Sequence, residues 1–373
     1  MDMKKIAILI LLFTLTTLTA SARQKEAGNM IKVEVSETVE LMGILSRTAG
    51  LREYNMDMAG QYTQDTEAWF APYKGHPIIA YYQGLHNSNG ISYDAVMSMA
   101  VHLEIVKGEV KFVGDKADLE KRWQNVDIED FMERINQFYT DTRFHKFFQA
   151  HRAFYDEALK TYEANVMTYF HQDWYPQFYG TAPTEKFRVV IGFTNGGGNY
   201  GTNRHLSGQA KEVFAICGYY IDPNTGKAFE NGAALSSTLI HEFNHSFVNP
   251  MLERETNNML MMPIGQKLHK LSALSMERQA YGNWQTVVNE SIVRAAVIVY
   301  MMEQGYTHKQ IQDELISQLC RDFAWMPELV TALRHYASHR TQYKTLNDYY
   351  PELATTLNKY LENEMRRAQE SLK

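Results

Sequence analysis

Two histidines stand four residues apart in the apolar stretch SSTLIHEFNHSFVNP, and a glutamate directly follows the first of them. On an α-helix His241 and His245 lie about 40° apart around the axis, so both side chains leave the same side. Neutral imidazoles are good zinc ligands, and Glu242 on the flank can reach a water on the ion. Zinc lowers the pKa of that water toward about 7, and a carboxylate can then take its proton. The opposite side of the helix is apolar and is expected to pack in the core: Leu239, Ile240, Phe243 and Phe247.

This combination of histidine, acid and histidine is uncommon in a chain of this composition. With 13 histidines and 43 acidic residues among 373, chance gives roughly 0.05 matches per chain, so we favour a metal site over a solvated histidine pair. His335 and His339, in RHYASHR, are also four residues apart. They have no adjacent acid, and the neighbouring arginines disfavour a second cation. We expect that pair to lie on a solvated helix face.

A third zinc ligand is expected from the apolar segment WQTVVNESIVRAAVIVYMM. A helix that is apolar on nearly every side is buried, and a buried glutamate needs a partner. Glu290 is therefore the predicted third ligand. The alternative is an internal ion pair with Arg294, one turn further on. Both can hold together, with Arg294 contacting the far carboxylate oxygen or a carboxylate of the substrate.

The motif HEFNH followed by NESIVRA resembles the gluzincin group of zincin metallopeptidases. In that group one helix carries two zinc histidines and the catalytic glutamate, and a later helix carries a zinc glutamate. The resemblance implies that His241, His245 and Glu290 bind Zn²⁺ and that Glu242 is the catalytic base. Arg294 stands where the group has an aspartate that orients a zinc histidine. The whole mature chain is also similar to a family of uncharacterised exported bacterial proteins, through segments such as VELMGILSRTAGL, HPIIAYY and YKTLNDYYP.

The same resemblance predicts where a substrate lies. Zincins usually hold an extended substrate along an edge strand beside the active-site helix, and KFRVVIGFTNGGGNYG precedes that helix here. Its glycines can admit a substrate backbone, although a flexible turn is an equal alternative. The predicted substrate-binding residues are Gly197, Asn199, Tyr200, His205, Tyr281 and Arg294. Of these, Tyr200, His205 and Tyr281 can each stabilise an oxyanion, and the sequence does not choose among them.

The first 22 residues read as a signal peptide. Two lysines precede the apolar run from residue 6 to 18, which is too short to span a bilayer comfortably, and a small-residue cleavage site follows at Ala20-Ser21-Ala22. We expect export to the periplasm or exterior, with a soluble mature chain and no stable membrane insertion. An uncleaved anchor is the alternative. The net charge of −6 gives no sign of a nucleic-acid-binding face.

Cys217 and Cys320 are the only cysteines. In an exported protein they can form a disulfide, but Cys217 sits in the apolar run EVFAICGYY and is as well explained as a buried free thiol. Two cysteines cannot build a zinc site made only of thiolates, which needs four.

The order of elements is helices, then strands, then helices, which predicts an α+β fold. Residues 128–169 read as one or two amphipathic helices, KFRVVIGFT and EVFAICGYYI as consecutive strands, residues 231–249 as the metal-binding helix ended by Pro250, and 285–304 as a second strong helix. We expect a mostly helical portion over residues 23–165 and a zincin-like catalytic portion over 166–373, which can form one compact domain.

The predicted function is an exported zinc metallopeptidase acting on a peptide or protein. Two alternatives stay open at this point: a zincin-like binding or surface module without turnover, and a hydrolase of non-peptide amide bonds.

Overall fold

The computed structural model describes residues 31–56, 58–279 and 281–373. Val33–Lys373 form one compact unit, to which both predicted portions, 23–165 and 166–373, contribute. The predicted signal peptide, residues 1–22, lies outside the described residues. Among the residues that the structure describes, no helix has both the length and the apolar character needed to cross a membrane.

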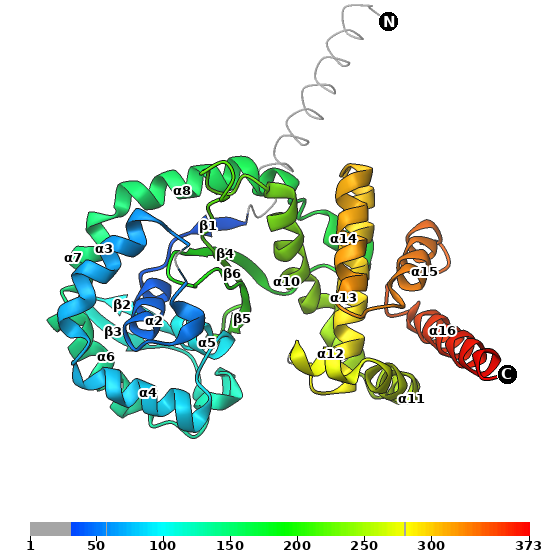
Figure 1. The fold of residues 1–373 in the computed structure, drawn as a ribbon, viewed down its shortest axis with the longest axis horizontal. Coiled ribbons are helices and arrows are strands. Elements are labelled where there is room, and N and C mark those ends of the chain that lie inside the picture. Colours follow the sequence, from blue (N-terminus) through cyan, green and yellow to red (C-terminus); the bar gives the residue numbers. More distant parts are fainter. Residues whose placement is uncertain (1–30, 57, 280) are drawn as a thin grey trace, which may run out of the picture. The chain divides into compact units, whose positions relative to one another are not determined.

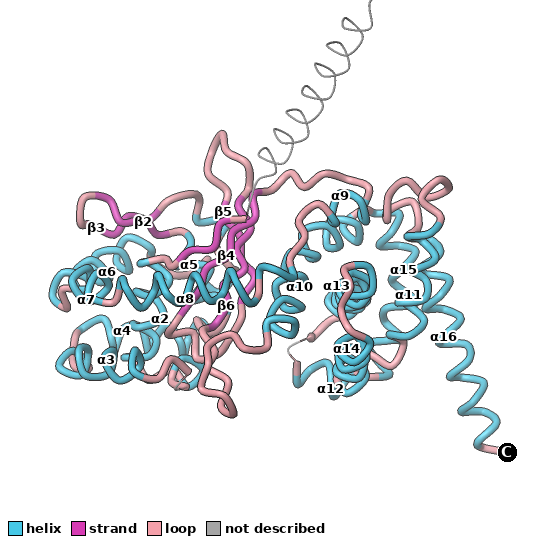
Figure 2. The backbone as a smooth tube through the Cα atoms, turned by 90° about the horizontal axis from the view of Figure 1, so that it is seen from above, coloured by secondary structure: helices cyan, strands magenta, loops and turns pink. Residues whose placement is uncertain are grey.

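A mixed sheet of four strands stands at the centre of the fold, in the order β1-β4-β6-β5. β4 (Lys186–Gly192) and β6 (Glu212–Gly218) are parallel neighbours, and β5 (Tyr200–Arg204) pairs with β6 in antiparallel fashion at one edge. The short β1 (Lys32–Glu34) lies at the other edge. Figures 1 and 2 place this sheet between the helices α2–α8 and the helices α10–α16.

The structure is mostly helical outside this sheet and one β-hairpin. Before the sheet the elements are α2 (Glu37–Thr48), α3 (Gln61–Phe70), α4 (Pro77–Asn89), α5 (Asp94–Val101), the hairpin β2 (Leu103–Val106) and β3 (Glu109–Phe112), α6 (Ile128–Asp141), α7 (Phe144–Ala150), α8 (Arg152–Asn165) and α9 (Trp174–Tyr179). After the sheet they are α10 (Gly232–Glu253), α11 (Glu255–Leu271), α12 (Ala273–Arg278), α13 (Trp284–Glu303), α14 (His308–Cys320), α15 (Met326–Ser338) and α16 (Tyr350–Ser371). The predicted α+β class is confirmed as a mostly helical α+β structure with a mixed sheet.

The sequence prediction for the central strands was incomplete. KFRVVIGFT and EVFAICGYYI do contain strands, but they are β4 and β6, and a further strand, β5, lies between them in the chain. β4 has a neighbour on each side, so the edge strand beside the metal-binding helix is β5. Tyr200–Arg204 is short and polar, which gives little strand signal by itself, and its pairing with β6 makes it a strand.

The helix α10, which carries His241 and His245, is longer than predicted. The side chain of Asn231 caps its start by accepting a hydrogen bond from the backbone of Ala234. Pro250 does not end the helix, which continues to Glu253. A proline near a helix end removes one backbone hydrogen bond, to the carbonyl four residues earlier, and the last turn tolerates this loss.

The apolar side of α10 packs as the sequence predicts. Leu239, Ile240 and Phe243 are fully buried. The Phe243 ring stacks on Phe187 of β4 at 4.3 Å between ring centroids, and buried Asn244 accepts a hydrogen bond from Tyr179 at 2.9 Å. These contacts fix the rotation of α10, so His241 and His245 face away from the sheet core toward α13.

The helix α13 is buried along nearly its whole length. It packs against α10, α11 and α15, which explains its continuous apolar sequence. The backbone of α13 is tied to α10 by Asn244, whose amide donates to the carbonyl of Val293 at 3.4 Å. Glu290 and Arg294, at 7% and 5% exposure, are therefore charged groups held in a packed interior.

A buried glutamate joins α2 to the end of β4. The Glu40 carboxylate accepts hydrogen bonds from the Phe193 backbone and from the Tyr62 hydroxyl, both at 2.8 Å. The Tyr62 hydroxyl also lies 2.9 Å from that of Tyr155. Burial raises the pKa of Glu40 to about 7, and the hydrogen bonds from Phe193 and Tyr62 only partly oppose this shift.

Glu40 is expected to make stability depend on pH. In the unfolded chain this carboxyl ionises near pH 4.3, whereas in the folded protein it keeps its proton to about pH 7. The free energy of unfolding should therefore fall by up to about 3 kcal/mol as pH rises through this window. The variant Glu40→Gln should lack this component. Urea unfolding of both proteins at pH 5 and pH 8 measures it, and equal pH dependences would contradict the assignment.

Candidate metal centre

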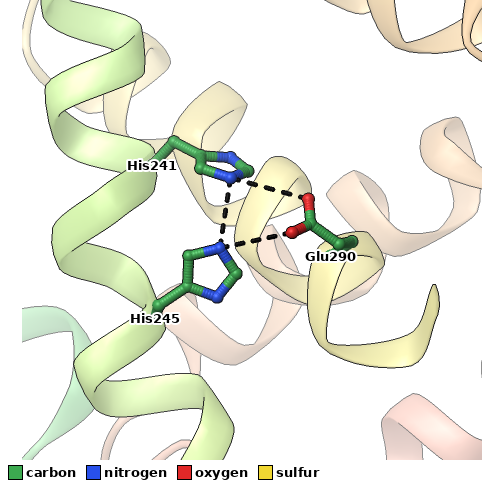
Figure 3. A group of neighbouring side chains, drawn as sticks. All are labelled: His241, His245 and Glu290. Atoms are coloured by element: carbon green, nitrogen blue, oxygen red, sulfur yellow. Dashed lines mark hydrogen bonds and ion pairs between the residues drawn. The ribbon is translucent and has the colours of Figure 1, made fainter. Parts of the chain in front are cut away.

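The two histidines of α10 and one glutamate of α13 meet side by side. In Figure 3 the His241 and His245 rings point from successive turns of one helix toward the Glu290 carboxylate on the facing helix. His241 Nε2 lies 3.1 Å from His245 Nε2. His241 Nε2 is 3.5 Å from Oε2 of Glu290, and His245 Nε2 is 3.4 Å from Oε1. This is the one group of three or more metal-ligating side chains found within the described residues.

These distances fit a zinc site. Ligands about 2.0–2.1 Å from a tetrahedral ion stand about 3.3–3.4 Å from one another. The nitrogen–nitrogen and nitrogen–oxygen separations of 3.1, 3.4 and 3.5 Å fall close to this value. Two imidazole nitrogens and a carboxylate also form the donor set of catalytic zinc sites that keep a fourth position for water. The three side chains thus offer one ligand atom each within 4.8 Å of one another, which is a group that could hold a metal ion.

The electrostatics of the group favour the metal-binding protonation states of His241 and Glu290, whereas His245 must lose a proton to bind a metal. Burial lowers the pKa of His241 to about 3, so this imidazole is neutral near pH 7. Burial works against ionised Glu290 too, but the neighbouring His241, His245 and Arg294 outweigh it and hold the pKa of Glu290 well below its usual range. For His245, burial is outweighed by the hydrogen bond and charge of Glu290, which raise the pKa. A metal cation would take the place of the proton on His245.

Asn249 sets the orientation of His245. Its Oδ1 lies 3.1 Å from His245 Nδ1, one turn further along α10. An amide oxygen accepts only, so Nδ1 carries a hydrogen and Nε2 is the nitrogen that faces Glu290 and His241 and would bind a metal once deprotonated. Partners of this kind fix the tautomer and the ring angle of metal-binding histidines.

We therefore expect Asn249→Ala to weaken zinc binding by about 10–100-fold without unfolding the protein. Competition with a fluorescent zinc chelator gives the dissociation constant directly. Asn258→Ala, a half-exposed asparagine on α11, is a matched control that should bind zinc normally. Unchanged affinity in Asn249→Ala would show that this contact plays no part in metal binding.

The Glu290 oxygen that faces His241, Oε2, has a second set of partners. Arg294 Nη2 lies 2.8 Å from Oε2, and the Tyr281 hydroxyl donates to the same oxygen at 3.2 Å. Arg294 also donates to the Tyr281 hydroxyl at 2.7 Å and to Oε1 of Gln318 at 2.9 Å. Both alternatives raised by the sequence are therefore present, because Glu290 pairs with Arg294 and still faces the two histidines.

Glu242 stands between the metal-ligating group and the edge strand. Its carboxylate lies so close to Gly201 of β5 that a Cβ atom at residue 201 would collide with Oε2. Burial raises the pKa of Glu242 to about 7; the charges of His245 and Arg294 oppose this shift and that of Glu290 adds to it. A carboxyl that titrates near neutral pH is well matched to accepting and returning a proton. Glu242 is not one of the three clustered ligands, so it is free for this work.

Two cavities meet at this group. One, of about 520 Å³, is lined by His241, Glu242, His245 and Glu290, and also by Tyr281 and residues of α14. The other, also of about 520 Å³, runs along Gly201, Thr202 and Asn203 of β5 and shares Glu242 and His245 with the first. The metal-ligating group thus lies where an elongated ligand could extend from the edge strand toward α14.

The remaining predicted substrate residues divide into two sets. Tyr281, Arg294 and Asn199 line the first cavity. Gly197 packs against the side chains of Met56 and Met58, and the buried Tyr200 stacks on Tyr54 at 6.3 Å between ring centroids. His205 is exposed. In the described part of the chain, Gly197, Tyr200 and His205 line neither cavity.

Some residues at the centre were not foreseen from sequence. Asn249 follows His245 by four residues, and this helical spacing with an amide side chain was a usable signal. Gly201 was also detectable in principle, because a glycine inside a strand often marks a close approach. Gln318 comes from α14, for which no local pattern indicated a position beside Glu290.

Other predicted features lie away from this centre. His335 and His339 stack at 3.9 Å between ring centroids, His335 Nδ1 lies 3.2 Å from the Tyr349 hydroxyl, and no third ligand joins them among the described residues. Cys217 is a buried free thiol and Cys320 an exposed one, so the disulfide alternative is not what the structure shows.

Comparison with known proteins identifies a family but no activity. No curated protein and no solved structure matches the chain. A family model does match, over residues 31–356, a range that contains α10, α13 and α14. The chain belongs to the family described as "Domain of unknown function (DUF4932)".

Proposed function

We propose that this protein is a zinc-dependent hydrolase, and specifically a metallopeptidase of the gluzincin type with a zincin-like catalytic portion. The observation that carries the proposal is the meeting of His241, His245 and Glu290, with ligand atoms within 4.8 Å of one another, and with Glu242 beside them at the junction of two cavities. A binding site without turnover would need the three ligands but not a buried carboxylate next to them. The predicted signal peptide supports action outside the cytoplasm.

The residues have distinct roles in this proposal. Bound at His241, His245 and Glu290, zinc would polarise a carbonyl and lower the pKa of a water to about 7. Glu242 takes the proton of the attacking water and returns it to the leaving amine. Tyr281, whose hydroxyl lies 3.2 Å from Glu290 Oε2, lines the same cavity, whereas Tyr200 and His205 do not, and this supports Tyr281 as the proposed oxyanion donor.

A peptide is the substrate class that the edge strand favours. β5 has an unpaired edge among the described strands, and its residues Gly201 to Asn203 line the second cavity. Unpaired backbone groups at a sheet edge can bind an extended peptide as an added strand. Gly201 lacks a side chain where β5 comes nearest to Glu242, so the proposed base lies directly against the strand along which the peptide would bind.

Peptide-library digestion tests the proposal. The zinc-loaded protein is incubated with a mixed peptide library, with and without a chelator, and the products are identified by mass spectrometry. We expect cleavage that the chelator abolishes and that added zinc restores. If no peptide is cut, a cell-wall digest tests hydrolysis of a non-peptide amide, and inactivity there too would favour a binding module.

Gly201→Ala tests the proposed base without any substitution of Glu242. The new methyl group would push the Glu242 carboxylate aside, while the three ligands stay untouched. We expect peptide hydrolysis to fall by about 10²-fold, the lower range for a general base, with zinc affinity unchanged. Gly84→Ala in α4 is the matched control, because the added methyl group would meet only open space. Gly208→Ala would not serve as a control, because the φ angle of Gly208 is positive and alanine would be strained there. Full activity in Gly201→Ala would contradict this placement of the base.

A further inference from the structure

The helix α14 contributes charged and polar side chains to the wall of the first cavity, and some of these are held by hydrogen bonds while another is not. Glu314, Gln318 and Arg321 all line this wall. Gln318 is buried; it accepts from Arg294 at 2.9 Å and donates to Glu314 Oε1 at 2.6 Å. The chain of contacts Glu290–Arg294–Gln318–Glu314 thus links the metal ligand to α14 and holds Glu314 in place.

Arg321 is different because its side chain takes no part in this chain of contacts. It is the C-cap residue of α14 and is exposed where it lines the cavity. Its backbone carbonyl accepts from Gln279, but within the described chain its guanidinium has no hydrogen-bonding or ionic partner. Arg294, the other arginine of the cavity, is already held by Glu290, Tyr281 and Gln318.

The two cavities also differ in charge on either side of the metal-ligating group. Apart from Glu242, the second cavity carries Glu185 and Glu253 against Lys211. On the α14 wall the Arg321 cation stands against the Glu314 carboxylate, whereas the β5 end has an excess of carboxylates, so a ligand extending through both would meet the more positive surroundings at the α14 end. This asymmetry would orient a ligand that carries a negative group at one end.

We propose that Arg321 forms a substrate-carboxylate subsite on the α14 side of the metal centre. The inference rests on the proposed metal site but adds a preference that the zinc chemistry does not require. The bound group is a carboxylate, either the C-terminus of a peptide or an acidic side chain. An arginine guanidinium presents paired donors suited to such a group, and Arg321 has them free.

Two pairs of hydroxamate ligands test this subsite by binding alone. In the first pair, succinyl hydroxamate is joined to glycine that ends in a free acid or an amide. In the second, it is joined to glutamate amide or glutamine amide. The hydroxamate provides the metal-binding group, and isothermal titration of the zinc-loaded protein gives each affinity without any need for turnover.

We expect the acid of at least one pair to bind about tenfold more tightly than its amide, as for a charge-assisted contact near the surface. The pair that shows the difference identifies the source of the carboxylate. Arg321→Gln should remove the preference, whereas Lys309→Gln, which removes a positive charge from the opposite end of α14, should retain it. Equal binding of acid and amide in both pairs, or a preference that survives in Arg321→Gln, would overturn the subsite. If none of the four ligands binds, the metal site is wrong and the subsite is rejected with it.

Discussion

Replacing Glu242 by glutamine is expected to lower peptide hydrolysis by about 10²–10⁴-fold while zinc stays bound. The amide keeps the size and position of the side chain beside Gly201 but cannot accept the proton of the attacking water. His241, His245 and Glu290 are unchanged, so the zinc affinity should stay within a few-fold of wild type. Loss of turnover with retained metal is the signature of a missing base rather than a missing ion.

The measurement compares kcat/KM and bound zinc for the same preparations, on the best peptide from the library digest. Glu255→Gln, at the exposed start of α11, controls for the loss of one negative charge and should behave as wild type. A Glu242→Gln variant with full metal content and undiminished hydrolysis would eliminate the proposed mechanism.

Replacing Glu290 by glutamine is expected to damage both metal binding and stability. Zinc affinity should fall by more than about 100-fold, because a direct ligand is lost rather than a partner of one. The free energy of unfolding should also fall by about 3 kcal/mol, even with a chelator present, because buried Arg294 loses its carboxylate. The glutamine oxygen can still accept a hydrogen bond but carries no charge to balance the guanidinium.

His245→Ala separates these two effects. It removes a ligand but leaves the pair of Glu290 and Arg294 intact. We expect it to lose zinc affinity as Glu290→Gln does, while its unfolding in urea with chelator stays closer to wild type. If Glu290→Gln unfolds like wild type under these conditions, the buried pair does not stabilise the fold as argued.

The cluster of His241, His245 and Glu290 was predictable because the local sequence pattern was sufficient for it. His241 and His245 lie on one helix face by spacing alone, and that face could be recognised by the apolar residues opposite it. Glu290 could be singled out because it interrupts a helix that is otherwise apolar all round, which is where an unpaired charge is costly. Both helices formed close to their predicted limits, except that α10 runs on past Pro250.

The rest of the centre depends on tertiary packing that no short segment reveals. β5 is polar and is a strand only because β6 pairs with it. α14 reaches Arg294 through Gln318, although 24 residues separate them in the chain. In the N-terminal portion, α2 and α5 are buried on almost every side, so they lack the amphipathic period by which a helix is recognised. The segment predicted as one or two helices over residues 128–169 is divided into α6, α7 and α8.

Zinc stoichiometry is the most direct test of the central claim, that His241, His245 and Glu290 hold one metal ion. The purified protein and His245→Ala are each incubated with excess zinc, freed of unbound metal by gel filtration, and analysed by inductively coupled plasma mass spectrometry. The account predicts about one zinc per wild-type chain and almost none in His245→Ala, since an open site needs three protein ligands. Wild-type protein that retains no zinc, or His245→Ala that retains as much as wild type, would contradict it.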